Sequence, residues 1–145
     1  MIEELVDSLL FEGYALYPYT PGAGKNSTPT PFGILYPRGY EYGFDHLQLQ
    51  CHVRGERPRV EVDVRFLQAS GERHRALAQR AGVGAIDLPP VAAEVTLASE
   101  QLEPGLHLVT LRIENRTAFA GGTRSEALER SLISTHPLLR ARGGR

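Results

Sequence analysis

Hydrophobic and polar residues alternate most regularly in three stretches of the chain, residues 47–53, 60–66 and 106–114. Strict alternation places the apolar side chains on one face of a β-strand and the polar side chains on the other. These stretches therefore predict strands with one face in the core and one face in water. We expect 47–53 and 60–66 to pair as adjacent antiparallel strands, because only the turn-like residues 55–58 separate them.

The remaining pattern is less regular. Residues 95–97 continue the alternation briefly, and Glu103-Pro104-Gly105 predicts a turn before the strand at 106–114. Residues 69–90 mix polar residues, alanines, glycines and prolines, and they predict a long crossing connection with at most one helical turn.

Helical spacing is confined to the two ends of the chain. Apolar residues in 2–10 fit a short amphipathic helix, whereas the aromatic residues that follow favour a strand over 9–17 instead. Residues 123–126 read Thr-Arg-Ser-Glu, a capping-box pattern that predicts a C-terminal helix. Pro137 restricts the residue before it, so this helix is expected to end near Ser134 or Thr135. The predicted fold is one mainly β domain over residues 1–145, an antiparallel sandwich or an open sheet with a short C-terminal helix.

Composition narrows the class of protein. The 145 residues fit one domain, and 16 basic against 17 acidic residues give a net charge of −1, which argues against a surface for nucleic acid. Cys51 is the single cysteine, so an intrachain disulfide is excluded, and it falls among the apolar positions of its stretch. No apolar run reaches the 18 or so residues of a membrane span, and the N-terminus lacks the basic start of a secretory signal. We expect a cytoplasmic protein.

Residues 10–37 are the least ordinary part of the chain. They hold four of the six tyrosines, five of the ten prolines and four of the glycines, so neither a long helix nor a long strand fits them. Such a segment either plugs one end of a sandwich or presents tyrosines to a protein partner, since Tyr offers a large contact area with a polar tip. The candidate partner-binding residues are Tyr14, Tyr17, Tyr19, Lys25, Asn26, Phe32 and Tyr36.

Patterns for reaction chemistry are weak. Residues 22–25, Gly-Ala-Gly-Lys, resemble a phosphate-binding loop, but Tyr19 stands where that motif needs glycine and Asn26 where it needs Ser or Thr. The five histidines show no helical zinc spacing. His52 and His107 are both expected on outward strand faces, where neighbouring strands can bring them together. No catalytic residue, metal or cofactor is predicted.

Three segments resemble a known family. Residues 9–37 contain Glu12-Gly13-Tyr14, then Leu16-Tyr17-Pro18-Tyr19, Lys25-Asn26 and Phe32-Gly33; residues 106–117 and 124–144 add further matches, including Ser131-Leu132 and Ser134-Thr135-His136. They resemble the N-terminal part of an uncharacterised bacterial family encoded beside nickel–iron hydrogenases. Members of that family are longer and continue after a Gly-Gly, so this chain is either a fragment or one of two separately encoded parts.

The resemblance implies a role around hydrogenase assembly or function and supplies no catalytic residues. We therefore expect a non-catalytic protein-binding accessory module whose partner is a hydrogenase subunit. Two alternatives stay open at this point. One is a small hydrolase or transferase that uses Ser134, His136 or His52, and the other is a structural subunit that self-associates through an edge strand.

Overall fold

The computed structural model describes residues 33–69 and 76–144, and within them the chain forms seven strands and one short helix. In chain order these are β1 (His46–Arg54), β2 (Arg59–Ala69), β3 (Ala76–Ala81), β4 (Gly84–Leu88), β5 (Val91–Glu103), β6 (Leu106–Asn115), α2 (Arg124–Glu129) and β7 (Ile133–Arg142). The helix or strand expected near the N-terminus lies outside the described residues. In the described part, no helix is long and apolar enough to cross a membrane.

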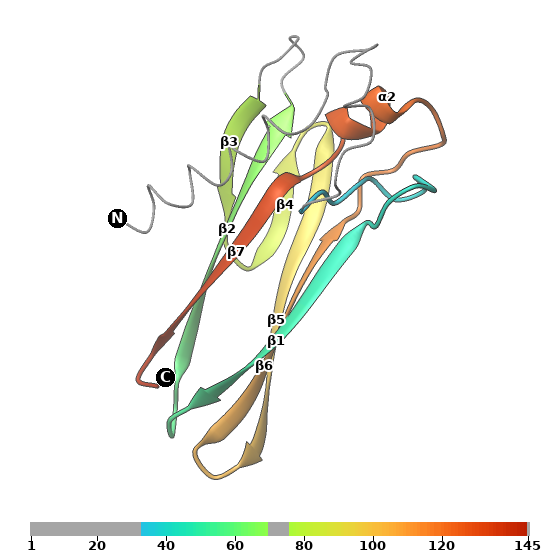
Figure 1. Ribbon diagram of the computed structural model, residues 1–145. Helices are drawn as coiled ribbons and strands as arrows, with labels where there is room; N and C mark the ends of the chain where they lie inside the picture. The colour runs from blue at the N-terminus through green and yellow to red at the C-terminus, as the bar shows by residue number, and fades with distance from the viewer. Residues whose placement is uncertain (1–32, 70–75, 145) are drawn as a thin grey trace, which may run out of the picture.

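The strands form two antiparallel sheets that face each other (Figure 1). One sheet has four strands in the order β1-β6-β5-β4, and the other has three in the order β3-β2-β7. The mainly β, antiparallel fold predicted from the sequence is confirmed. The main hydrophobic core contains residues of both sheets: Leu35, Val64, Phe66, Ile86, Val91, Ala93, Val95, Leu111, Ile113 and Leu132.

The strand at 106–114 shows why alternation is a strong signal. Val109, Leu111 and Ile113 of β6 are at most 1% exposed, while the residues between them are half-buried on the other face. Burying each such side chain contributes about 1.5–3 kcal/mol. A slip by one residue would turn this whole apolar set toward water, so the register of β6 is well specified.

The predicted pairing of 47–53 with 60–66 is wrong. β1 pairs with β6, from His46↔Glu114 to Arg54↔Leu106, whereas β2 lies between β3 and β7 in the other sheet. In this position both faces of residues 64–68 are buried, because Val64 and Phe66 pack in the main core and Leu67 packs in the second cluster on the outer face. The short connection after β1 crosses between the sheets. Gly55 in this connection has a φ of 143°, which glycine adopts easily and other residues rarely adopt.

The long connection expected at 69–90 is also wrong, since this region holds β3 and β4. Both are edge strands, one in each sheet, and most of β3 is exposed or half-buried. An edge strand has one neighbour and needs few large apolar residues, so the alanines and polar residues of 76–81 give little strand signal. Residues 70–75 lie outside the described part.

The C-terminal helix begins as predicted and ends early. Oγ1 of Thr123 accepts a hydrogen bond from the Glu126 amide at 3.2 Å, which confirms the capping box at the start of α2. The helix stops at Glu129 rather than near Ser134, and β7 begins at Ile133. The expected helix end is therefore wrong. Leu132 and Ile133 are fully buried in two different core clusters, and only an extended backbone sends adjacent side chains to opposite faces.

A second core cluster covers the outer face of β2 at the end of the molecule that carries α2. Leu67 points outward from β2 and packs with Ala127 and Leu128 of α2. Ile34, Tyr36 and Ile133 complete this cluster. The helix therefore covers the outer face of the three-stranded sheet at one end, and no other described element covers that face at the opposite end.

Candidate functional site

Most of the partner-binding residues predicted from the sequence lie outside the described part of the chain: Tyr14, Tyr17, Tyr19, Lys25, Asn26 and Phe32. Tyr36 is the exception, and it is 5% exposed within the second core cluster. Its amide donates to the Phe44 carbonyl at 2.9 Å. The Tyr36 ring stacks on Tyr40 with a centroid distance of 4.7 Å. Tyr36 therefore acts as the base under the residues that follow it, and its own ring has little area for a partner.

Three aromatic residues that follow Tyr36, together with the distant Phe119, form an aromatic surface. We call this the aromatic surface: Tyr40, Tyr42, Phe44 and Phe119. Tyr42 is 83% exposed and Phe44 is 77% exposed, the two most exposed large hydrophobic side chains of the described residues. The ring of Tyr40 meets those of Tyr42 and Phe119 edge-on, at 5.7 and 6.1 Å. The sequence signal was present, because Tyr40, Tyr42 and Phe44 alternate with Glu41 and Gly43 just before β1.

Two glycines let the aromatic surface lie close to its support. An added Cβ at Gly43 would collide with the ring of Tyr36, and an added Cβ at Gly39 would lie 2.5 Å from the carbonyl oxygen of Phe119. Gly39 also has a φ of 98°, which L-residues rarely adopt. The guanidinium of Arg130 lies over the Phe119 ring at 5.9 Å from its centroid. The surface therefore rests on a fixed base.

Burial, together with the neighbouring Tyr36, raises the pKa of Tyr40, and the charge of Arg124 acts in the opposite direction. The Tyr40 hydroxyl is therefore neutral at physiological pH. Carboxylates flank the same stretch, since Glu41 is exposed and Asp45 half-exposed. Since Arg124 and Arg130 also lie beside these rings, the border of the aromatic surface carries charges of both signs.

A buried asparagine joins three segments beneath this surface. Asn115 is 0% exposed, and its side-chain amide donates to the carbonyls of Leu35 at 3.0 Å and Arg130 at 2.8 Å. Its side-chain oxygen accepts from the Thr117 amide at 3.0 Å. Leu35 also forms a bridge with Leu132. This junction therefore joins residues from all three segments that carry the family resemblance.

The Ser-Leu-x-Ser-Thr-His pattern at 131–136 also belongs to the junction. Ser131 is buried and donates to the Ala127 carbonyl at 2.7 Å, and the Thr135 amide donates to the Gly33 carbonyl at 2.8 Å. Ser134 is buried, with a φ of 51°. Nδ1 of His136 lies 2.7 Å from the backbone carbonyl of Ser134. These contacts hold the passage from α2 into β7.

The expectation that His52 and His107 share an outward face is wrong. His107 pairs with the buried Val53, so it lies on the inward side of β6, and its Nε2 is 3.1 Å from the Gly55 carbonyl. His52 is exposed on the other face of that sheet. Cys51 is half-buried on the apolar face of β1, as predicted. Residues 33–69 and 76–144 contain no group of three or more His, Cys, Asp or Glu side chains able to hold a metal ion.

An ion-pair network lies on the outer face of the four-stranded sheet, centred on Glu114. Arg38 and Arg112 donate to its two carboxylate oxygens at 3.0 and 3.3 Å, and Arg116 lies 3.5 Å away while also pairing with Glu94. Burial acts to raise the pKa of Glu114, but the two hydrogen bonds and the charge of Arg116 outweigh it and lower the pKa below the ordinary 4.5.

This network predicts a pH-dependent stability. A carboxyl group whose pKa is lower in the folded state stabilises the fold above its unfolded pKa, and the stabilisation is lost as the pH falls through the folded pKa. We expect the Glu114→Gln variant to have a lower Tm than the wild type at pH 7, and the gap to narrow as the pH falls below 4.5 and through the lowered pKa of Glu114. Thermal unfolding of both proteins from pH 3 to 7 measures this. Glu100→Gln is the control, because Glu100 is exposed and makes no ion pair with a described residue. A gap that is constant with pH would contradict the prediction.

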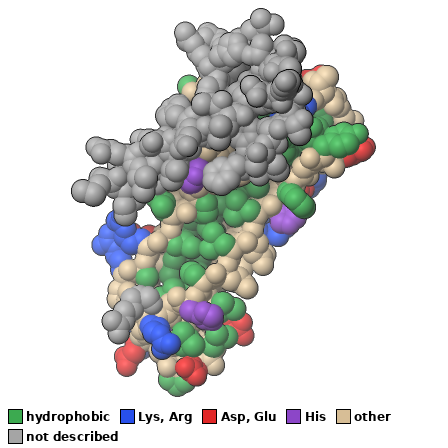
Figure 2. All heavy atoms as spheres, viewed as in Figure 1, with side chains coloured by type: hydrophobic (Ala, Val, Ile, Leu, Met, Phe, Trp, Pro, Cys, Tyr) green, Lys and Arg blue, Asp and Glu red, His purple; other side chains and the backbone are tan. Residues whose placement is uncertain are grey.

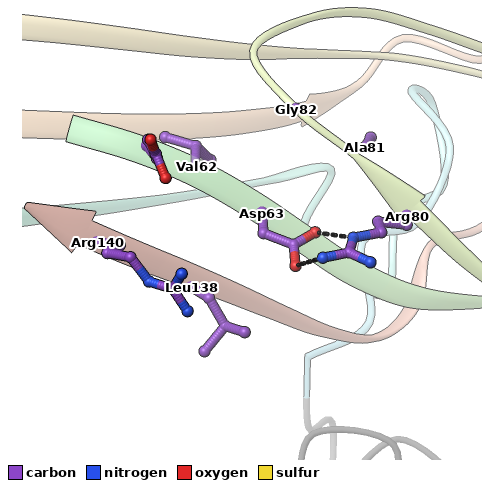
Figure 3. Close-up of a pocket in the computed structure, with 8 residues that line it drawn as sticks. Val62, Asp63, Arg80, Ala81, Gly82, Leu138 and Arg140 are labelled. Atoms are coloured by element: carbon purple, nitrogen blue, oxygen red, sulfur yellow. Dashed lines mark hydrogen bonds and ion pairs between the residues drawn. The ribbon is translucent and has the colours of Figure 1, made fainter. Parts of the chain in front are cut away.

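A cavity of about 470 Å³ lies on the outer face of the three-stranded sheet (Figure 3). Asp63 of β2 and Arg80 of β3 face each other across it and form two contacts, at 2.9 and 2.8 Å. Leu138 and Arg140 of β7 line the other side. Glu61 also lines the cavity. The described lining combines the charged side chains of Glu61, Asp63, Arg80 and Arg140 with the apolar side chains of Val62, Ala81 and Leu138.

Comparison of the chain with models of protein families, with curated proteins and with solved structures finds no match in any of the three. The resemblance to the hydrogenase-associated family therefore stays a prediction.

Proposed function

We propose that the chain is a non-catalytic protein-binding domain that contacts its partner through the aromatic surface. The observation that carries the proposal is the exposure of Tyr42 and Phe44, at 83% and 77%, on a base of stacked rings. Burying two such side chains at an interface removes a large apolar area from water. Aromatic residues of this kind supply much of the binding energy in protein complexes.

The rigidity of the base strengthens this proposal. A side chain that is already held in place loses less conformational entropy on binding than one on a free loop. Tyr40 is fixed between Tyr36 and Phe119, and Gly39 and Gly43 hold the backbone close to that base.

The partner that we propose is a subunit of a nickel–iron hydrogenase, for which this chain serves as an accessory or assembly factor. The family resemblance supports this choice, since three of its segments meet at the junction next to the aromatic surface. The candidate residues from Tyr14 to Phe32 stay part of the proposed binding region.

Co-expression with the large and small subunits of a nickel–iron hydrogenase from the same organism, followed by affinity capture, tests the proposal. We expect the wild type to retain a subunit and the Tyr42→Ser/Phe44→Ser variant to lose it by at least about tenfold, as expected for hot-spot residues. Leu77→Ser/Val83→Ser is the matched control. These side chains are 53% and 57% exposed, on β3 and in the turn before β4.

The control variant should capture as much hydrogenase as the wild type. Equal capture by the Tyr42→Ser/Phe44→Ser variant would show that the aromatic surface is not the contact. Both double variants truncate mostly exposed side chains, so their Tm values should stay near that of the wild type.

A further inference from the structure

The edge of β7 that faces away from β2 has no described strand beside it. Among the described strands β7 pairs only with β2, in a ladder that includes Arg59↔Arg142 and Arg65↔His136. Residues 138–142 on its other side have no described strand beside them. An open edge presents unpaired amide and carbonyl groups, which an extended peptide can use to join the sheet.

The inward side of this edge is apolar. Leu139 and Ala141 of β7 are half-buried, and so are Leu47, Leu49 and Cys51 on the inner face of β1, the matching edge strand of the other sheet. Figure 2, in the view of Figure 1, shows hydrophobic side chains running between the two sheets along the side where β7 and β1 form the edges. A strand added to β7 would bring its inward side chains onto this strip.

The outward side of the same edge is basic. The outer face of the three-stranded sheet carries five arginines against two carboxylates: Arg59, Arg65, Arg80, Arg140 and Arg142 against Glu61 and Asp63. Glu61 pairs with Arg142 at 2.8 Å and Asp63 pairs with Arg80, so both carboxylates are already neutralised. Arg140 is exposed beside the cavity and makes no ion pair with a described residue.

We propose that an extended segment of the protein partner adds as a strand along residues 138–142 of β7. Its inward side chains are apolar and cover the strip between Leu139 and Leu49. Its outward side chains are carboxylates that lie beside Arg140 and Arg142. The proposal rests on the proposed function, since it names a second contact and its chemistry on the same protein-binding domain.

A second copy of the chain is a poor occupant for this edge. Two β7 strands in contact would place Arg140 and Arg142 of one copy beside the same arginines of the other, and like charges opposite each other destabilise a sheet. Charged residues at a sheet edge are a known device against self-pairing. The same arginines favour an acidic strand, so the edge discriminates between the two occupants.

The test uses two capped nine-residue peptides, one alternating valine with glutamate and the other alternating valine with lysine. Fluorescence anisotropy measures binding, and amide hydrogen exchange locates the bound strand. We expect the Val/Glu peptide to bind at least about tenfold more tightly than the Val/Lys peptide, because two opposite-charge pairs replace two like-charge pairs. Binding should slow the exchange of amides within residues 138–142.

Reversing the charge of the edge should reverse this preference. In Arg140→Glu/Arg142→Glu the Val/Lys peptide should become the tighter ligand. The matched control is Arg54→Glu/Arg57→Glu, which changes the net charge equally at exposed positions on β1 and in the turn after it, and should keep the wild-type order. The pair of Arg142 with Glu61 is mostly exposed, so its loss costs little stability.

Several results would overturn the β7 proposal: no binding of the Val/Glu peptide, equal affinity for both peptides, or unchanged exchange in β7 on binding. The outcome is separable from that of the proposed function. The Tyr42→Ser/Phe44→Ser variant should still bind the Val/Glu peptide. Loss of hydrogenase capture with intact peptide binding would remove the aromatic contact alone, and the reverse result would remove the β7 contact alone.

Discussion

Asn115→Asp is expected to lower the free energy of unfolding by at least about 3 kcal/mol. The change keeps the shape of the side chain but replaces the amide that donates to the Leu35 and Arg130 carbonyls. Two buried carbonyls then lose their donor, at about 1–3 kcal/mol each, and a carboxylate faces them without a positive partner. Because a domain of this size is stable by only about 5–15 kcal/mol, the variant should be close to unfolding. Urea titration followed by circular dichroism at pH 7 measures the loss.

Gln50→Glu is the matched control for this change. It makes the same amide-to-carboxylate replacement on the exposed face of β1, where Gln50 donates to the Thr110 hydroxyl at 3.1 Å. We expect its stability to stay within about 0.5 kcal/mol of the wild type. If Asn115→Asp proves equally mild, the junction is held by packing and its hydrogen bonds contribute little.

Gly39→Ala is expected to destabilise the protein by about 2–5 kcal/mol and to weaken hydrogenase capture as well. The φ of 98° strains an L-residue, and the new methyl group would meet the Phe119 carbonyl oxygen at 2.5 Å. That atom is backbone, so relief requires the loop bearing Tyr40 and Tyr42 to move away from Phe119. Chemical denaturation measures the first effect, and capture of the hydrogenase subunit measures the second.

Gly121→Ala is the control that separates backbone strain from the steric clash of a new methyl group. Gly121 has a similar φ of 111°, but nothing lies within 4 Å of the position where a Cβ would stand. This variant should therefore lose only the strain, about 1–3 kcal/mol, and keep its partner. Equal effects of the two substitutions on stability and on capture would mean that the close approach of Gly39 to Phe119 is unimportant.

The sequence pattern predicted correctly those elements whose structure depends mainly on their own residues. The alternation of 106–114 predicts β6, since one buried face and one half-buried face repeat every two residues. The Thr123 capping box predicts the start of α2, because both partners of that hydrogen bond lie within one turn.

Pattern failed where partners distant in sequence decide the outcome. The pairing of β1 with β6 instead of β2 depends on how two sheets divide seven strands, which no local stretch encodes. β3 and β4 gave little signal because an edge strand needs few apolar residues. The early end of α2 follows from the burial of Leu132 and Ile133 in separate clusters, which the helical spacing of 128 and 132 does not reveal.

The sequence predicted an aromatic binding surface, but the aromatic surface that the structure describes lies further along the chain. The sequence directed attention to tyrosines between Tyr14 and Tyr36, and the aromatic surface that the structure describes begins where that range ends. Tyr36 shows the difficulty, since an aromatic ring in the sequence looks the same whether it is a contact or a support. Only the fold shows that Tyr36 is the support and that Tyr42 and Phe44 are exposed.

The order of the strands also bears on how the chain folds. β4, β5 and β6 follow one another in sequence and pair in the same order, so they can form by local steps. The ladder of β2 with β7 joins Arg59 to Arg142, and the closure of so long a loop costs entropy before its contacts stabilise anything. β7 is also the last of the described strands to leave the ribosome. Until it arrives, the edge of β2 opposite β3 has no described strand beside it, and its backbone groups can pair with another chain.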